Sequence, residues 1–218
     1  MFTTTRTRAA SLFIGLTLLT ASAMGCSEDT EYKQAFAFPV TANLANAEYI
    51  NAAGEDVSTS VGEAATEDLT SKPLLFNVSV DMETPNPDLA AAAQGSELDS
   101  LTIDQILYTV TNNSADVATQ PMDLYLVPEG VTTLPEDRGG SGEDAPVLMG
   151  TIPSIPAGEQ TSGEVILYPE NFAAAQMHVF DLKFNVISET GLAVATGDPV
   201  PGGQIEATVD VQMTITTK

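Results

Sequence analysis

The 218-residue chain contains few of the side chains from which most enzymes build reactive sites. It has one cysteine, one histidine and no tryptophan. A single cysteine cannot form an intramolecular disulfide, and a thiolate metal cluster is equally excluded. The sequence also lacks the motifs G-x-S-x-G, H-E-x-x-H, G-x-x-x-x-G-K-[ST] and G-x-G-x-x-G. We therefore expect no catalytic residues, no bound cofactor and a function other than catalysis.

Basic residues are also scarce, with seven Lys and Arg against thirty Asp and Glu. The formal net charge of −23 makes nucleic acid an implausible partner, because its phosphates would be repelled. High solubility, as in a saline habitat, explains such acidity most simply. The alternative is a surface that binds cations.

The N-terminal segment has the three-part order of a secretory signal peptide. Arg6 and Arg8 form a basic region, an apolar run extends from Ala9 to Ala23, and no acid precedes Glu28. A run of about 15 residues is shorter than the roughly 20 that a transmembrane helix needs. We expect residues 1–25 to be a signal peptide that is cleaved.

The only cysteine closes this segment, in the sequence AMGC at residues 23–26. The sequence resembles the lipobox of bacterial lipoproteins, although Leu is more usual at Ala23 and a smaller residue at Met24. The resemblance implies that Cys26 carries a diacylglyceryl group and an N-acyl chain. Two or three acyl chains would anchor the mature protein firmly to a membrane.

Two further features of this region bear on where the protein resides. Ser27, rather than Asp, follows the cysteine, which in enterobacterial-type sorting favours the outer membrane over the inner membrane. The competing interpretation is ordinary secretory cleavage after the sequence ASA at residues 21–23, which would release a free chain. After cleavage before Cys26, five bases remain against thirty acids, a formal net charge of about −25.

The mature chain divides by composition into a short tether and a body. Residues 26–33 are expected to form a polar tether, and residues 34–218 a single β-sandwich domain. Within the body, residues 42–72 are rich in Ala, Glu, Asp, Thr, Ser and Gly. We expect this stretch to be a low-complexity insertion, either a long loop or a disordered segment.

Alternating apolar and polar residues predict antiparallel strands through the rest of the body. The clearest alternation is at the C-terminus, where the apolar positions are Ile205, Ala207, Val209, Val211, Met213 and Ile215. Shorter alternations mark the segments 74–82, 101–110, 122–127 and 178–188, and residues 147–169 are expected to form two strands that flank a Pro- and Gly-rich corner. Short helices are expected at 86–94, which has Pro87 at its start, and at 170–176.

Two local features refine these strands. The apolar phase changes near Asp104, which predicts a β-bulge. Pro39 interrupts the alternation of residues 34–40, and a proline is tolerated at the edge of a sheet but not at its centre. The segment 34–40 is therefore predicted to be an edge strand.

The order of these segments over residues 98–218 resembles the immunoglobulin-like modules of bacterial surface proteins. The likeness includes the sequence TIPSIPAGE at residues 151–159, which fits the pattern x-I-P-x-I-x-x-G-E found at a corner between strands. The resemblance implies an all-β fold, an antiparallel immunoglobulin-like β-sandwich with one or two short helices and long acidic loops.

Candidate binding residues are few. Glu136, Asp137, Glu143 and Asp144 place four carboxylates in a Gly-rich stretch, which suits calcium, although the spacing of an EF-hand is absent. His178 could in principle serve a catalytic triad or a zinc site, but a structural or surface role is expected.

The sequence thus predicts an exported, membrane-anchored cell-envelope lipoprotein that presents a β-sandwich as a structural or interaction module. Its partners would be the membrane, through the lipid anchor, and an envelope protein or polymer. One alternative is a carboxylate-based hydrolase of an envelope or extracellular polymer. Another is a sandwich that binds calcium or holds a small apolar ligand between its sheets, which requires an internal cavity.

Overall fold

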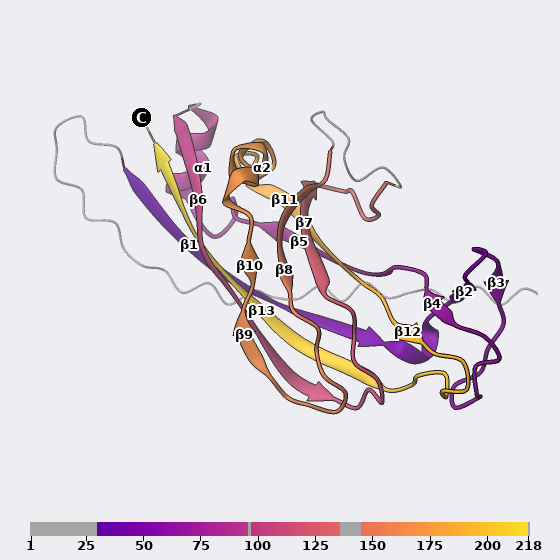
Figure 1. Ribbon diagram of the computed structural model, residues 1–218. Coiled ribbons are helices and arrows are strands. Elements are labelled where there is room, and N and C mark those ends of the chain that lie inside the picture. Colours follow the sequence, from indigo (N-terminus) through magenta and orange to yellow (C-terminus); the bar gives the residue numbers. More distant parts are fainter. Residues whose placement is uncertain (1–29, 96, 136–144, 218) are drawn as a thin grey trace, which may run out of the picture.

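The computed structural model describes residues 30–95, 97–135 and 145–217, and its main body is two antiparallel sheets packed face to face (Figure 1). In spatial order, the first sheet contains β1 (Glu31–Asn43), β13 (Gln204–Thr217), β6 (Leu98–Asn113) and β9 (Ser162–Glu164). The second contains β10 (Ile166–Leu167), β8 (Val147–Ile152), β7 (Met122–Pro128), β11 (Lys183–Thr190) and β5 (Leu74–Asp81). The all-β, antiparallel sandwich predicted from the alternating segments is confirmed.

The core fills the space between the two sheets. Side chains alternate across a strand, so the apolar residues of each strand point to one face and meet those of the opposite sheet. Phe36 and Phe38 of β1 are stacked with ring centroids 6.3 Å apart, and Phe36 meets Phe184 of β11 edge-on at 6.2 Å. Phe38 and Phe184 are among the largest fully buried side chains. Aromatic contacts between strands far apart in sequence thus join the two sheets.

The order of the strands is that of a jelly roll, a sandwich of two sheets whose strands are joined by Greek-key connections. The first strand, β1, lies beside the last, β13, and the next long strand, β5, lies in the opposite sheet. In an immunoglobulin-like sandwich the first and second strands share a sheet. The immunoglobulin-like arrangement is therefore not confirmed, because a local motif such as TIPSIPAGE does not determine which distant strand lies alongside.

Two local predictions about the first sheet are confirmed. β1 is an edge strand, and its Pro39 is exposed opposite Thr208 of β13. The register between β6 and β13 shifts so that Gln212 pairs with Gln105 and Met213 with Ile103. Asp104 is the extra residue of this bulge, and its carboxylate accepts a hydrogen bond from the Thr214 hydroxyl at 2.8 Å.

Residues 42–72, expected to be a loop or a disordered segment, instead form ordered structure. A 3-10 turn (η1, Leu44–Asn46) leads into β2 (Tyr49–Asn51), β3 (Asp56–Val57) and β4 (Leu69–Ser71). With β12 (Ala193–Val194) these strands make a small sheet at one end of the sandwich (Figure 1). The small sheet is packed against the sandwich through three side chains that are buried in the common core: Leu44, Tyr49 and Leu69.

The predicted tether is also shorter than expected, because β1 begins at Glu31. Thr30 precedes the strand and is held by the C-terminal strand: the Thr217 N–H donates to the Thr30 carbonyl at 3.0 Å. The Thr30 N–H in turn donates to the Thr217 hydroxyl at 3.3 Å. The beginning of the folded body and the end of β13 therefore lie side by side.

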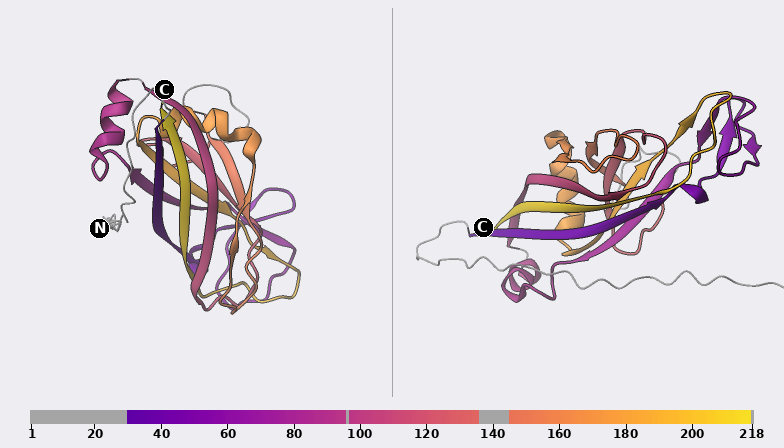
Figure 2. Two further views of the ribbon diagram at one scale, coloured as in Figure 1. Left: turned by 90° about the vertical axis from the view of Figure 1, so that its left-hand side faces the viewer. Right: turned by 90° about the horizontal axis from the view of Figure 1, so that it is seen from below.

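Two helices lie toward the same end as Thr217, and the small sheet lies at the other end (Figure 2). Helix α1 (Pro87–Gln94) has the predicted bounds within a residue, and the Asn86 side chain caps it by accepting from the Leu89 N–H at 3.3 Å. Helix α2 (Phe172–Val179) follows a 3-10 turn (η2, Pro169–Asn171) and extends past the predicted 170–176.

The strand predicted at 178–188 begins later than expected, at Lys183. His178 and Val179 belong to α2, and Leu182 adopts a positive φ of 59° where the chain turns from the helix into β11. Phe180 and Leu182 continue the alternation of the strand by coincidence, because they lie in the turn between α2 and β11. Periodicity alone does not separate the two arrangements over so few residues.

The outer face of the second sheet is less polar and less exposed than its alternation suggests. Tyr125, Val127 and Ile187 point away from the core between the sheets, yet all three are buried. The buried Asn185 side chain on the same face donates to the Val131 carbonyl at 2.8 Å and accepts from the Ser79 hydroxyl at 3.1 Å. The segment after β7 therefore folds back over this face and is fixed there by Asn185.

Gly203 lies where two other backbone segments, at Leu44 and at Ser114, come close to it. Its carbonyl accepts from the Leu44 N–H at 3.0 Å, and a Cβ atom at Gly203 would lie 2.1 Å from the Ser114 carbonyl oxygen. Its φ of 87° is in the left-handed region that favours glycine.

Replacing Gly203 by Ala is expected to lower the free energy of unfolding by clearly more than replacing Gly197 by Ala. Both glycines have a φ near 90°, but a Cβ at Gly197 would meet no atom within 4 Å. Gly197→Ala should therefore cost only the conformational strain, about 1–2 kcal/mol, and Gly203→Ala that strain plus a backbone overlap. Urea unfolding of the two variants measures the difference, and equal losses would contradict the close approach.

Candidate functional site

The lipid-attachment and calcium candidates lie outside the described residues. This holds for Cys26 and for Glu136, Asp137, Glu143 and Asp144. Within residues 30–95, 97–135 and 145–217, no group of three or more His, Cys, Asp or Glu side chains could hold a metal ion. The structure therefore does not describe how these candidates lie.

His178 lies in the last turn of α2 and is buried, with a relative exposure of 2%. Its Nε2 atom is 3.0 Å from the carbonyl oxygen of Ala145, just before β8. A ring nitrogen that bonds a backbone carbonyl fixes the helix against the neighbouring strand, so the contact fits a structural role.

Carboxylates are plentiful, and those of the described segments are exposed or half-buried. The buried polar side chains of the described segments include no Asp or Glu. Asp68 is one of these acids. Its carboxylate accepts hydrogen bonds from the Thr196 hydroxyl at 2.7 Å and from the Thr196 N–H at 2.8 Å. Both bonds lower the pKa of the Asp68 carboxyl. A general acid needs a pKa shifted in the opposite direction, usually by burial.

Two cavities between the sheets are small, and both are lined mainly by apolar side chains. The larger lies among Phe36, Phe184, Met149 and their neighbours, with about 20 Å³ of space for the centre of a water molecule. The other, near Tyr108 and Ile152, has about 10 Å³. Such spaces hold at most one water molecule, so the described core is filled rather than hollow.

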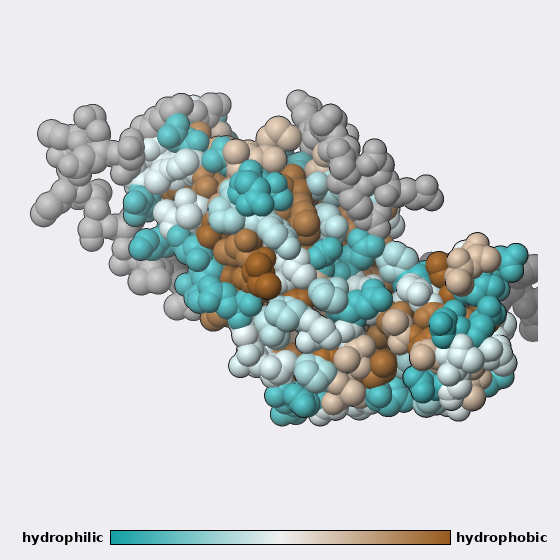
Figure 3. Space-filling view, in the orientation of Figure 1, coloured by the Kyte–Doolittle hydropathy of each residue, from teal (hydrophilic) through white to brown (hydrophobic). Residues whose placement is uncertain are grey.

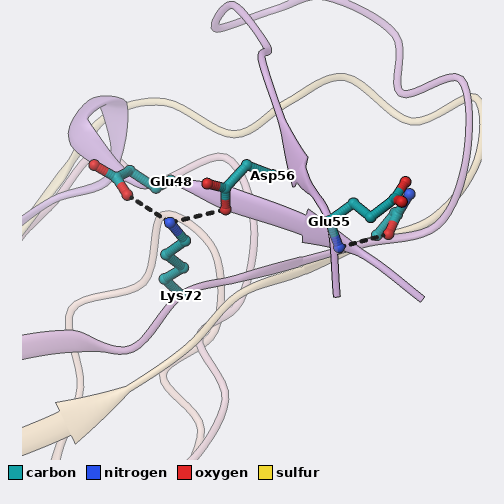
Figure 4. Close-up of polar contacts among 5 residues, drawn as sticks. Glu48, Glu55, Asp56 and Lys72 are labelled. Atoms are coloured by element: carbon teal, nitrogen blue, oxygen red, sulfur yellow. Dashed lines mark hydrogen bonds and ion pairs between the residues drawn. The ribbon is translucent and has the colours of Figure 1, made fainter. Parts of the chain in front are cut away.

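The small sheet carries the most evident ion pairs of the structure. Lys72 Nζ lies 3.1 Å from Glu48 Oε2 and 2.8 Å from Asp56 Oδ1 (Figure 4). Hydrogen bonds to Asp56 and Glu48 raise the pKa of Lys72. All three side chains are exposed, and an exposed ion pair contributes little to stability. The lysine thus holds Glu48, which precedes β2, and Asp56 of β3 close to the body without forming a buried site.

The hairpin between β2 and β3 is shaped by Asn51. Its side-chain oxygen accepts from the N–H groups of Ala53 and Glu55, each at 3.0 Å, and Gly54 supplies the positive φ of 79° that the turn requires (Figure 4). The turn projects Glu55 and Asp56 into solvent, which makes this end of the molecule acidic.

Tyr49 of β2 has the most unusual polar group of the described residues. Its side chain is buried, with a relative exposure of 3%, and its hydroxyl is the one buried side-chain atom of the described segments without a hydrogen-bond partner. Burial, together with the nearby Asp116 carboxylate, raises the pKa of Tyr49 to about 12. Asp116 itself accepts from the Gly202 N–H at 3.0 Å.

Sequence reasoning missed the buried Tyr49 and the exposed Asp116 near it, because neither lies in a segment that was expected to contribute to the core. Tyr49 falls within the supposed low-complexity stretch, and Asp116 within a turn-rich one. The available signal was Tyr49 itself, a large aromatic residue between Glu48 and Ile50 in a stretch otherwise poor in large side chains.

The surface shows scattered apolar side chains rather than one continuous hydrophobic face. The exposed large ones within the described segments are Val61, Leu75, Ile166 and Met177. Figure 3 shows an apolar patch over β10, which carries Ile166, among mainly polar surroundings. No helix among the described residues is long and apolar enough to cross a membrane.

The comparisons with known proteins do not assign the chain to a family. No protein-family model matches the chain, and no curated protein does. Solved structures that align with it include a chain of mud crab tombus-like virus, with 11% identity over 100% of this chain and 94% of the viral one, at a TM-score of 0.29. Chains of desmodium yellow mottle tymovirus (13% identity, 100% and 96% covered, TM-score 0.22) and turnip yellow mosaic virus (11%, 95% and 90%, TM-score 0.24) also align. Scores this low carry no inference about fold or function.

Replacing Tyr49 by Phe is expected to raise the free energy of unfolding by about 1 kcal/mol at neutral pH, because a buried hydroxyl without a partner is costly. Tyr168→Phe is the matched control: the Tyr168 hydroxyl lies 3.1 Å from the Thr151 hydroxyl, so its removal should destabilise the protein. Chemical denaturation measures both changes. A loss of stability in Tyr49→Phe would mean that the hydroxyl is hydrogen-bonded after all.

The same tyrosine gives a pH dependence of definite sign. Its pKa is raised on folding, so its contribution to stability is fully present below pH 10 and is lost as the pH rises through about 12. The unfolding free energy of the unmodified protein should therefore fall more steeply than that of Tyr49→Phe between these values. Parallel curves for the two proteins would refute the raised pKa.

Proposed function

We propose that the protein is a cell-envelope lipoprotein, anchored through lipid on Cys26, that presents the sandwich as a structural or interaction module. The observation that carries the proposal is the position of the cysteine relative to the fold. β1 begins at Glu31, five positions after Cys26, and Thr30 is already bonded to β13. An acylated residue so close to the first strand would tether the folded body directly to the membrane surface.

A non-catalytic role is supported by the placement of the acids. A carboxylate-based hydrolase needs a general acid whose pKa is raised, next to a second carboxylate. The pKa of the Asp68 carboxyl is instead lowered, and so is that of Asp81, where hydrogen bonds from Thr84 and the charge of Lys183 outweigh the opposing effect of partial burial. The small size of the two cavities between the sheets also favours a packed core over one that holds a small apolar ligand.

The proposed partners follow from the anchor and from the charge. The lipid inserts in the membrane, and Ser27 after the cysteine favours the outer membrane. The body is strongly acidic, so its second partner is an envelope protein or polymer rather than a nucleic acid.

Mass spectrometry of the mature N-terminus tests the proposal. The expected first residue is Cys26 carrying the mass of a diacylglyceryl group and an N-acyl chain. Cys26→Ser should abolish this mass and move the protein from the membrane to the soluble fraction. Ser27→Asp is the matched control, since it changes the neighbouring residue but should retain the lipid. An unmodified start within residues 22–26 would instead establish secretory cleavage and a free chain.

A further inference from the structure

The two ends of the sandwich differ in what they expose. One end carries Thr30, the end of β13 and the two helices, and the opposite end carries the small sheet (Figures 1 and 2). β1 runs from the first end toward the second over 13 residues. A strand of that length extends roughly 40 Å, which separates the ends by far more than the reach of a short tether.

The distance from the proposed lipid to the fold is limited by the length of the chain between them. Cys26 and Thr30 are four residues apart, and four residues span at most about 14 Å whatever path they take. The end that carries Thr30 must therefore stay near a bilayer that holds Cys26. The tether alone would still permit the sandwich to lie on its side.

The exposed surface of α2 distinguishes end-on from side-on attachment. The helix contains no Asp, Glu, Lys or Arg from Phe172 to Val179, and its one titratable residue, His178, is buried. Its exposed residues are Ala173, Ala174 and Met177, the last with a relative exposure of 47%. The exposed face of the helix itself is therefore uncharged, and the exposed acids Glu170 and Asp181 lie just before and just after it. An uncharged face can approach lipid headgroups at a lower cost of desolvation than a charged one.

Acids are exposed at both ends. Glu31, Asp88 and Asp181 lie at the end with the helices, and a longer run of acids lies at the opposite end. The loop and strands from residue 55 to residue 68 expose Glu55, Asp56, Glu63, Glu67 and Asp68. Lys72 is the nearby base and is already paired with Glu48 and Asp56. Anionic headgroups repel such a surface, so its most favourable position is the one farthest from the bilayer.

We propose that the protein stands end-on, with the α2 face toward the bilayer surface and the small sheet displayed as the outermost tip. This orientation rests on the proposed lipidation of Cys26. It assigns the exposed α2 face to the bilayer. It also makes β2, β3 and the loop around Val61 the surface that an envelope partner meets first.

Three single-cysteine variants of the full lipidated protein test the orientation. Met177→Cys, Ile166→Cys and Val61→Cys replace side chains of similar exposure (47%, 59% and 53%) on α2, on β10 and beside the small sheet. The acylated Cys26 has no free thiol, so a fluorophore reacts with the new cysteine alone. The labelled proteins are inserted in phosphatidylethanolamine–phosphatidylglycerol vesicles that contain a headgroup-attached quencher. Urea unfolding of each labelled variant confirms that it is folded.

The expected loss of fluorescence is largest at position 177, smaller at 166 and absent at 61. Quenching at 166 that equals or exceeds that at 177 would establish side-on attachment and overturn the proposal, as would quenching at 61. The mass of the N-terminus shows whether a negative result contradicts the proposed lipidation or only the proposed orientation. An unacylated Cys26 overturns the proposed function and the orientation with it, whereas an acylated Cys26 with the wrong quenching order overturns the orientation alone.

Discussion

The pairing of β1 with β13 is the constraint on which the rest of the structure depends. The register is continuous over the whole of β1, from Glu31 opposite Thr216 to Asn43 opposite Gln204. Closing a loop across nearly the entire chain costs conformational entropy, and the buried side chains of both strands, such as Phe38 and Ile215, must offset it. Because β13 lies between β1 and β6, this one pairing completes the first sheet and brings Thr30 next to Thr217.

How much of this fold the sequence predicts depends on how local each feature is. Three features depend only on adjacent residues and are predicted correctly: the alternation of β13, the exposed Pro39 at the sheet edge and the bulge at Asp104. The strand order is not local, because TIPSIPAGE fits a corner between strands in more than one kind of sandwich. β2, β3 and β4 are two or three residues long, too short to show a period. They are stabilised by β12, more than 120 positions further along than β4.

The candidate site was harder to predict than the fold for a related reason. A side chain becomes chemically unusual through its surroundings, and those surroundings come from distant segments. Tyr49 acquires its raised pKa because it is buried in the common core and lies near the Asp116 carboxylate. His178 looked like the start of a strand, but its burial and its contact with Ala145 follow from the position of α2 beside β8. Neither the raised pKa of Tyr49 nor the burial of His178 can be predicted from the residue types and spacings in one stretch of sequence.

The few bases of the described segments explain how the fold tolerates its acidity. Lys72 joins Glu48 to Asp56 across the small sheet, and Lys183 pairs with Glu83 beyond the end of β5. Both lysines lie where acids from different elements would otherwise repel one another. No Asp or Glu of the described segments is fully buried, so water and salt weaken the mutual repulsion of the remaining acids. The acidity is therefore a property of the surface that the protein displays, and the exposed face of α2 is a part of that surface without a charge.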